Sequence, residues 1–382
     1  MRHTLENGVL TIHLPERIDT STIAETETDL LTILKSVPHT SLVFDASSLQ
    51  FISSVGLRLV LKCKKDEASL RIENANTEAY DIFEMTGFTQ ILDIQKRFRE
   101  ISIAGCPLIG KGAYGKVYRL SPDTIVKSYF RGNPVADIER ERNLAKQAFV
   151  LGIPTAISYD IVRIKEEKLG AVYELIEADS LLDALLKSPS HYEEYLKQYV
   201  ALLDQMRHTH VQSDMIPSYK EDLRIRLTRV EKFLDPITLA KLSSFVESLP
   251  DSDFLLHGDC HFKNLFSTPD GLLLIDMDTL SKGEPFYELA CLFKTYVTFN
   301  VIEPINAIEF FGIEHTFCEK LFEDVFEGLC KDDPNKEEIR KKVELIGWFM
   351  YVGHACRHPE REAKHIEEGT KYLLQAIEAL GL

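Results

Sequence analysis

The chain has 382 residues, of which 45% are hydrophobic and 27% are charged, and its formal net charge at pH 7 is −16. This composition is typical of a water-soluble globular protein, and a domain size of roughly 150 residues predicts two or three lobes. The acidic balance argues against nucleic acid as a partner, and no stretch approaches the roughly 20 apolar residues of a membrane span.

The cysteines and the N-terminus indicate a cellular compartment. Seven cysteines are scattered along the chain, odd in number and without a C-x-x-C pair. Such a pattern is typical of reduced thiols, and the N-terminus MRHTLENGVL lacks the apolar core of a signal peptide. We therefore expect a cytoplasmic protein.

Residues 1–99 alternate between strand and helix patterns. Such alternation predicts an α/β domain in which helices cover a sheet. The pattern ends near residues 99–106, where we expect a domain boundary. The expected strands are 9–14, 41–45, 70–73 and 91–94, and the expected helices are 22–36, 54–65 and 77–85.

The segment SLVFDASSLQFISSVGLRLVLKCKK is the most informative part of this first domain. It combines a strand that ends in Asp45 with a serine-rich turn that opens a helix, and in this it resembles the STAS domain of anti-sigma-factor antagonists. The resemblance implies that a serine here is phosphorylated and controls the binding of a protein partner. Ser54 matches that position best, and the adjacent Ser53 stands where the best-known members carry Asp. The simpler interpretation is a helix cap, worth about 1 kcal/mol.

A glycine-rich segment, IGKGAYGKVYRL, follows the boundary. Gly110, Gly112 and Gly115 form G-x-G-x-x-G, and Val117 comes two residues later. In a dinucleotide-binding motif these glycines would open a helix, whereas residues 116–120 continue as a strand. Because glycine lets the backbone approach phosphates closely, the segment predicts a nucleotide-covering hairpin, and it resembles the glycine-rich loop of the protein-kinase-like fold.

Lys127 and Glu141 are the next candidate nucleotide-binding residues. Lys127 follows three apolar or β-branched residues in the expected strand 123–128, where its ammonium reaches the α- and β-phosphates of a nucleotide if a carboxylate holds it. In the helix expected at residues 134–151, Glu141 lies on the inward-facing stripe and Glu139 does not. The alternative is that Lys127 and Glu141 are solvated surface charges.

An apolar run with a polar turn after it, residues 171–177, is expected to join two lobes. Backbone groups near Glu174 and Ile176 are expected to bind adenine, a contact that needs no particular side chain. Helices are expected from residue 181 to about 250 and again after residue 303.

The stretch HGDCHFKNLFSTPDGLLLIDMD gathers oxygen ligands. Asp259 and Asn264 lie five positions apart in a loop, and a TPDG turn reverses the chain so that an apolar strand returns Asp276 beside them. Three such side chains suit a hard cation, and Mg²⁺ is the usual one where phosphate is present. Asp278 follows as a second metal ligand or as a loop anchor.

Together these motifs resemble the aminoglycoside phosphotransferase and choline kinase family, a protein-kinase-like group, over residues 100–382. The resemblance implies that Asp259 accepts or orients the proton of an acceptor hydroxyl. It implies that Asn264 and Asp276 hold Mg²⁺. Lys127, paired with Glu141, would grip the phosphates of ATP. Glu288, in the segment GEPFYELA, stands where relatives often place Asp.

The expected architecture is an α/β STAS-like domain at residues 1–99 and an α+β bilobal protein-kinase-like domain. Its nucleotide-binding lobe is expected at residues 100–177 and its mostly helical catalytic lobe at 178–382. The leading hypothesis is an ATP-dependent phosphotransferase with a small-molecule hydroxyl acceptor: a sugar, an aminoglycoside or an amino alcohol. The alternatives are a protein kinase acting on a STAS-domain serine and a nucleotide-binding scaffold without turnover. No long activation segment follows Asp276, which argues against an ordinary protein kinase.

Overall fold

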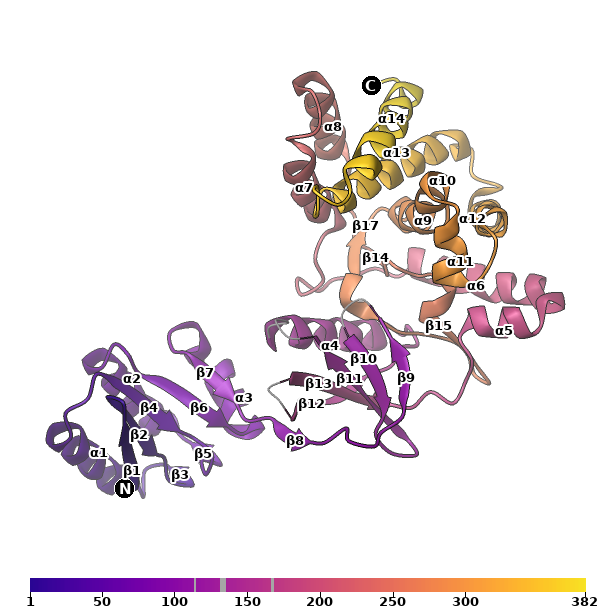
Figure 1. The fold of residues 1–382 in the computed structure, drawn as a ribbon. Coiled ribbons are helices and arrows are strands. Elements are labelled where there is room, and N and C mark those ends of the chain that lie inside the picture. Colours follow the sequence, from indigo (N-terminus) through magenta and orange to yellow (C-terminus); the bar gives the residue numbers. More distant parts are fainter. Residues whose placement is uncertain (113–114, 131–134, 166–167) are drawn as a thin grey trace. The chain divides into compact units, whose positions relative to one another are not determined.

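The computed structural model of the chain describes residues 1–112, 115–130, 135–165 and 168–382 (Figure 1). The chain divides into two compact units, one made of Met1–Ala104 with Ile161–Gly170 and the other of Gly105–Asp160 with Ala171–Leu382. Each unit has its own hydrophobic core. Within the described residues, no helix combines the length and the apolar composition needed to cross a membrane.

The first unit is built on a five-stranded sheet. Its strands lie in the order β1-β2-β4-β6-β7, and all neighbours pair in parallel except β1 with β2. The amphipathic helix α1 buries Leu30 and Ile33, which lie one turn apart. The elements are β1 (His3–Glu6), β2 (Val9–His13), β3 (Arg17–Ile18), α1 (Ile23–Ser36), β4 (Ser41–Asp45), β5 (Phe51–Ile52), α2 (Ser54–Asp66), β6 (Arg71–Ala75), α3 (Thr77–Met85) and β7 (Ile94–Lys96). The expected α/β domain is confirmed.

Ser53 and Ser54 stand at the start of α2. Ser53 is the N-cap residue, but its side chain accepts no hydrogen bond from the helix, and its buried hydroxyl has no partner among the described residues. Ser54 is the first helical residue and is exposed. The interpretation of a serine side chain as the cap of this helix is therefore wrong.

A six-stranded sheet and one helix form the part of the chain that carries the glycine-rich segment. The strands lie in the order β8-β12-β13-β11-β10-β9. Their bounds are β8 (Arg99–Ile101), β9 (Leu108–Lys111), β10 (Gly115–Arg119), β11 (Thr124–Tyr129), β12 (Ser158–Ile164) and β13 (Lys168–Glu174), and α4 covers Val135–Val150. As expected, the glycines do not open a helix: Gly110 lies in β9, Gly115 is the first residue of β10, and Gly112 lies between these two paired strands.

The remainder of the second unit is mostly helical, and among its described residues two short two-stranded pairings, β14 with β17 and β15 with β16, link its loops. Its helices are α5 (Leu181–Lys187), α6 (Tyr192–Arg207), α7 (Tyr219–Val230), α8 (Pro236–Ser248), α9 (Phe286–Phe293), α10 (Phe299–Ile302), α11 (Ile305–Phe311), α12 (His315–Cys330), α13 (Lys336–Ala355) and α14 (Ala363–Leu380). Its strands are β14 (Phe254–Leu256), β15 (Leu265–Thr268), β16 (Gly271–Leu274) and β17 (Ser281–Gly283). A π-helix, Lys294–Thr298, joins α9 to α10. The sequence pattern did not predict it.

Candidate active site

Lys127 is held by two carboxylates that come from distant parts of the chain. Its Nζ lies 2.8 Å from Oε1 of Glu141 on α4 and 2.6 Å from Oδ1 of Asp276, just after β16. Glu141 also accepts hydrogen bonds from the hydroxyls of Tyr129, at 2.9 Å, and Tyr173, at 3.3 Å. The buried Glu141 carboxylate therefore has one ammonium and two hydroxyl donors as partners, and it fixes the position of the Lys127 side chain.

The charge of Lys127 is secured by the same contacts. Burial by itself would lower the pKa of the ammonium, but the negative charges of Asp276 and Glu141 outweigh burial and raise the pKa. The side chain is thus a permanent cation that can meet an anionic phosphate.

The sheet register places Lys127 beside the glycine-rich hairpin, on the neighbouring strand of the same sheet. Val117 on β10 pairs directly with Lys127 on β11, and Gly110 on β9 pairs with Val117 from the other side. The three strands therefore present the hairpin and the lysine at one place.

Of the three glycines in the motif, only Gly115 is required by its packing. A Cβ atom there would lie 2.3 Å from the carbonyl oxygen of Ser128, so no larger residue fits. An added Cβ at Gly112 would meet no atom within 4 Å, and one at Gly110 would make ordinary contacts. The Gly112 amide donates to the Gly115 carbonyl at 3.0 Å. Residues 113 and 114 lie outside the described residues.

The expected adenine-binding segment lies at the end of β13. Glu174 is the last strand residue and is exposed, while Ile176 is half-buried in the segment that follows. Between them, the Leu175 amide donates to the carbonyl of Asp123 at 2.8 Å. The role of this backbone in binding adenine stays a prediction.

Asp259 and Asn264 are joined within one loop. Nδ2 of Asn264 donates to the Asp259 carbonyl at 3.0 Å and lies 3.4 Å from its Oδ2. Asn264 is buried, whereas the Asp259 side chain is 36% exposed and open to a substrate. With its amide nitrogen used in this way, Asn264 has its Oδ1 free of hydrogen bonds to the described residues and able to face a cation.

The predicted hairpin returns Asp276 to this loop. Strands β15 and β16 pair from Leu265↔Leu274 to Thr268↔Gly271, and the Ile275 amide then donates to the Asn264 carbonyl at 2.9 Å. The next residue, Asp276, has a φ of 66°, in the left-handed region that costs a non-glycine residue roughly 1–3 kcal/mol. We attribute the retention of this conformation to the carboxylate that it aims at Lys127.

Glu288 stabilises the backbone of the loop that carries Asp259. Its Oε2 accepts the backbone amides of His257, at 2.7 Å, and Gly258, at 3.0 Å. Burial raises the pKa of this carboxyl group. A fully buried acceptor thus fixes the backbone immediately before Asp259, a contact that the sequence alone did not reveal.

Two buried tyrosines hold the same loop, and no local sequence signal pointed to either. The hydroxyl of Tyr199 on α6 donates to the Cys260 carbonyl, and the hydroxyl of Tyr296 accepts the Phe262 amide at 2.9 Å. Their positions depend on how the helices pack around the loop.

The donor set at this site suits a hard cation that is also bound by phosphate. Asn264 and Asp276 supply amide and carboxylate oxygens, the ligand types that Mg²⁺ prefers. Among the described residues, no group of three or more His, Cys, Asp and Glu side chains is arranged to hold a metal ion.

Asp278 lies beside these ligands. Burial, with the negative charges of Asp276 and Glu141, raises the pKa of its carboxyl group to about 7. Among the described residues it makes no hydrogen bond or ion pair, so the structure offers no contact for the loop-anchor interpretation.

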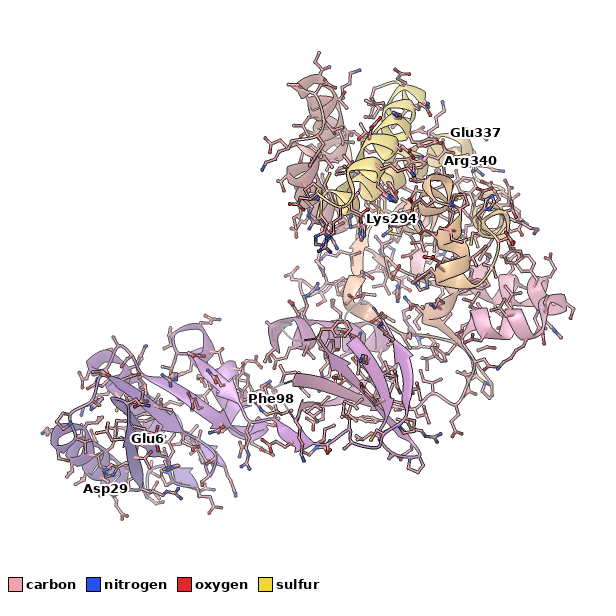
Figure 2. All side chains as sticks on the ribbon, viewed as in Figure 1. Glu6, Asp29, Phe98, Lys294, Glu337 and Arg340 are labelled. Atoms are coloured by element: carbon pink, nitrogen blue, oxygen red, sulfur yellow. The ribbon has the colours of Figure 1, made fainter. Side chains whose placement is uncertain are left out.

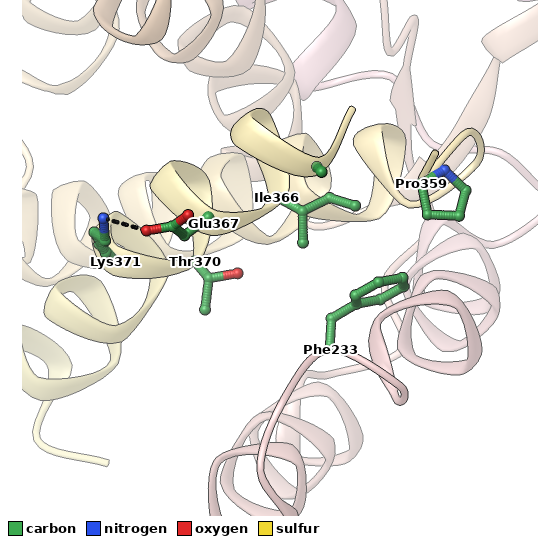
Figure 3. Close-up of a pocket in the computed structure, with 7 residues that line it drawn as sticks. Phe233, Pro359, Ile366, Glu367, Thr370 and Lys371 are labelled. Atoms are coloured by element: carbon green, nitrogen blue, oxygen red, sulfur yellow. Dashed lines mark hydrogen bonds and ion pairs between the residues drawn. The ribbon is translucent and has the colours of Figure 1, made fainter. Parts of the chain in front are cut away.

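A cavity of about 420 Å³ lies elsewhere on the second unit (Figure 3). It is formed by α14 together with Phe233, which precedes α8, and Pro359, which follows α13. None of the predicted site residues lines it. The candidate site is therefore defined by its polar contacts and not by this cavity.

The mixed sheet that carries Lys127 is followed by a mostly helical region that carries Asp259 and Asp276. This arrangement is a bilobal protein-kinase-like fold. The family model described as the phosphotransferase enzyme family matches residues 105–313, more than half of the chain, and the chain belongs to this family. The STAS domain model matches residues 3–101. Both resemblances drawn from the sequence are confirmed.

The fold is similar to solved structures of aminoglycoside phosphotransferase APH(4)-Ia. The apo form of a thermostable mutant has a TM-score of 0.52 at 11% identity, over 72% of this chain and 94% of that chain. A ternary complex of a further mutant with ADP and hygromycin B has a TM-score of 0.52 at 10% identity, with the same coverage. No curated protein sequence gave a match. The structural likeness supports the fold assignment.

Proposed function

We propose that the chain is an ATP- and Mg²⁺-dependent phosphotransferase that moves the γ-phosphate to a hydroxyl group of a small molecule. A sugar, an aminoglycoside or an amino alcohol would provide such a hydroxyl. The observation that carries the proposal is the placement of Lys127 between Glu141 and Asp276, since this arrangement combines a phosphate-binding cation with a carboxylate for a metal.

In the proposed reaction, Asp259 accepts the proton of the acceptor hydroxyl. The hydroxyl oxygen forms a bond to the γ-phosphorus, the bond from that phosphorus to the β,γ-bridging oxygen breaks, and ADP leaves with the bonding electron pair. Lys127 binds the α- and β-phosphates. Asn264 and Asp276 would hold Mg²⁺, which when bound neutralises charge on the β- and γ-phosphate oxygens.

The nucleotide would lie under the glycine-rich hairpin. We propose that the phosphates and the ribose of the nucleotide are covered by Gly110, Gly112, Gly115 and Val117. Backbone groups near Glu174 and Ile176 would bind the adenine. Glycine favours this arrangement because the backbone can approach the phosphate oxygens without a side chain between them.

A transfer assay tests the proposal. The full chain is incubated with Mg²⁺, ATP and single hydroxyl compounds, and the phosphorylated product is measured by mass spectrometry. We expect product with at least one compound, and none with Asp259→Asn. If the chain binds ATP but transfers phosphate to no compound and to no protein, the non-catalytic scaffold becomes the better interpretation.

A protein-directed activity is the second candidate, because Ser54 is exposed at the first position of α2. In that case the STAS domain would be both a substrate and a binding site for a protein partner. Mapping phosphosites after incubation with Mg²⁺ and ATP tests this, with Ser54→Ala and Ser53→Ala as matched variants. No phosphate on either serine, together with turnover of a small hydroxyl compound, would exclude it.

A further inference from the structure

His257 is a buried histidine at the start of the loop that carries Asp259, and the proposed reaction does not use it. It directly follows β14, and because its relative exposure is 0% it does not reach a bound substrate. A buried polar side chain of this kind is expected to have hydrogen-bond partners. Both ring nitrogens of His257 have one, and the two partners lie in the segments that carry Asp259 and Asp276.

These two partners determine which ring nitrogen of His257 carries the proton. The amide nitrogen of Asp259 lies 3.2 Å from Nδ1, and because an amide can only donate, Nδ1 must be the acceptor. The carbonyl oxygen of Ile275 lies 3.1 Å from Nε2, and because a carbonyl can only accept, Nε2 must carry the proton. A single tautomer therefore satisfies both contacts.

The backbone of Ile275 is held on both sides, just before Asp276. Its amide donates to the Asn264 carbonyl at 2.9 Å, and its own carbonyl accepts from the His257 ring. The Ile275 carbonyl and the Asp276 amide belong to one planar peptide unit, so the contact with His257 orients the plane from which Asp276 turns into its left-handed conformation. The ring of His257 thus helps to aim the Asp276 carboxylate at Lys127.

The backbone of His257 is anchored as well. Its amide donates to Glu288 on α9, the helix that ends just before Lys294 (Figure 2). Its carbonyl oxygen accepts the Thr279 hydroxyl at 2.8 Å. A Cβ atom at Gly258 would lie 2.9 Å from the Thr279 carbonyl oxygen, so these two backbone segments pack closely. His257 is therefore fixed through both its main chain and its ring.

We propose that His257 is a positioning residue for phosphate transfer, whose imidazole ring joins the segment of Asp259 to the segment of Asp276. The inference rests on the phosphotransferase function proposed above and adds to it a residue that does not touch the substrate. The acceptor hydroxyl has to face Asp259 while Asp276 holds the metal, and phosphate transfer depends mainly on such positioning. A direct link between the two segments sets the spacing at which the base and the metal ligand act together.

Two substitutions of His257 remove one ring contact each. Asparagine carries an acceptor oxygen at the position of Nδ1 and readily accepts the amide two residues later, so His257→Asn keeps the Asp259 contact and loses the one to Ile275. Glutamine carries an amide nitrogen near the position of Nε2, so His257→Gln keeps the Ile275 contact and leaves the Asp259 amide without its acceptor. His257→Leu removes both contacts. His358→Asn, at an exposed position after α13, is the matched control.

Calorimetric titration with ATP and Mg²⁺ separates the two contacts when it is combined with kinetics on a compound that gives product in the transfer assay. We expect His257→Asn to raise the Kd for ATP with Mg²⁺ about ten- to a hundredfold, because Asp276 loses its orientation. We expect His257→Gln to lower kcat by about the same factor and to leave this Kd unchanged, because only Asp259 is displaced. His257→Leu should show both losses and His358→Asn neither.

The tautomer of His257 provides a test that does not depend on activity. In the full chain labelled with ¹⁵N-histidine, NMR correlations between ring nitrogens and ring protons identify the nitrogen that carries the proton. The signals of His257 are those that disappear in His257→Leu, and we expect its proton on Nε2. A proton on Nδ1, or averaging between the two nitrogens, would overturn the inference, because the ring would then not accept the Asp259 amide.

Two further results would contradict a positioning role. One is an unchanged Kd and kcat in both His257→Asn and His257→Gln while the wild type is active, which would leave the proposed reaction intact. The other is a loss of equal size in all three His257 variants that follows their melting temperatures, which would show a purely structural role.

Failure of the proposed function has a different signature. If the wild type transfers phosphate to no compound, that function fails, and the Kd for ATP with Mg²⁺ still decides the inference. A higher Kd in His257→Asn but not in His257→Gln supports it, and an equal Kd in the two variants contradicts it.

Discussion

Lys127 and Asp276 are separated by 149 positions in the sequence, yet the ammonium of one lies 2.6 Å from a carboxylate oxygen of the other. Glu141 holds the same ammonium from α4 at 2.8 Å. The lysine is therefore the one positive charge between two acidic groups, and it links β11 to the segment after β16. Removing it would leave the buried Glu141 carboxylate with only its two tyrosine hydroxyl donors and the partly exposed Asp276 carboxylate without a cation.

Replacement of Lys127 by methionine is predicted to weaken ATP binding and to destabilise the second unit. The loss of a charge-assisted contact to phosphate predicts about a ten- to hundredfold higher Kd for ATP. Because Asp276 is partly exposed, we expect a stability loss of only about 1–3 kcal/mol. Calorimetric titration and thermal unfolding measure the two effects. Lys146→Met, an exposed position on α4, is the control, and an unchanged ATP affinity in Lys127→Met would contradict the assigned role.

Replacement of Asp259 by asparagine is predicted to stop phosphate transfer without affecting nucleotide binding. The loss of a general base typically reduces kcat by about 100- to 10,000-fold. Asparagine has a similar shape, so the loop and its bond to Asn264 should persist. Steady-state kinetics and ATP titration check both parts. Asp270→Asn in the exposed TPDG turn should behave as wild type, and residual activity close to wild type in Asp259→Asn would argue for a different base.

Replacement of Glu288 by alanine is predicted to lower both stability and kcat. The amides of His257 and Gly258 would lose their buried acceptor, which costs about 1–3 kcal/mol for each unsatisfied group. Glu288→Gln keeps an acceptor oxygen and should lose less. Thermal unfolding and kcat measured together distinguish the variants, and equal effects of alanine and glutamine would show that the negative charge matters more than the hydrogen bonds.

Acid is predicted to destabilise the protein partly through His354. Partial desolvation of the imidazole ring and the positive charges of Lys294 and Arg357 hold its folded-state pKa at about 4, below the value of about 6.5 for an unfolded histidine. Above pH 6.5 both states are neutral, so the contribution is fully present. As the pH falls from 6.5 to 4, the unfolded state binds the proton first and stability is lost.

Melting temperatures at pH 7, 6 and 5 test this pH dependence. His354→Gln should reduce the loss between pH 7 and 5, whereas His191→Gln, at an exposed position just before α6, should leave it unchanged. Identical pH profiles for wild type and His354→Gln would show that other groups control acid unfolding.

The sequence by itself determined the α/β first domain, the glycine-rich hairpin, the hairpin before Asp276 and the choice of Glu141 over Glu139 as the inward-facing residue. These features are local. Apolar periodicity reports which face of a helix or strand is buried, and turn residues report where the chain reverses, so no distant contact is needed to infer them.

Only the tertiary structure decided which distant groups share one site. The bond between Lys127 and Asp276 and the support of the catalytic loop by Glu288 both depend on how separate elements pack. The interpretation of a serine side chain as the cap of α2 was wrong for the same reason, because the hydroxyl of Ser53 at the N-cap position can cap the helix only if its rotamer and surroundings allow it. Charge balance within a folded site is a property of packing, and the linear order of residues does not encode it directly.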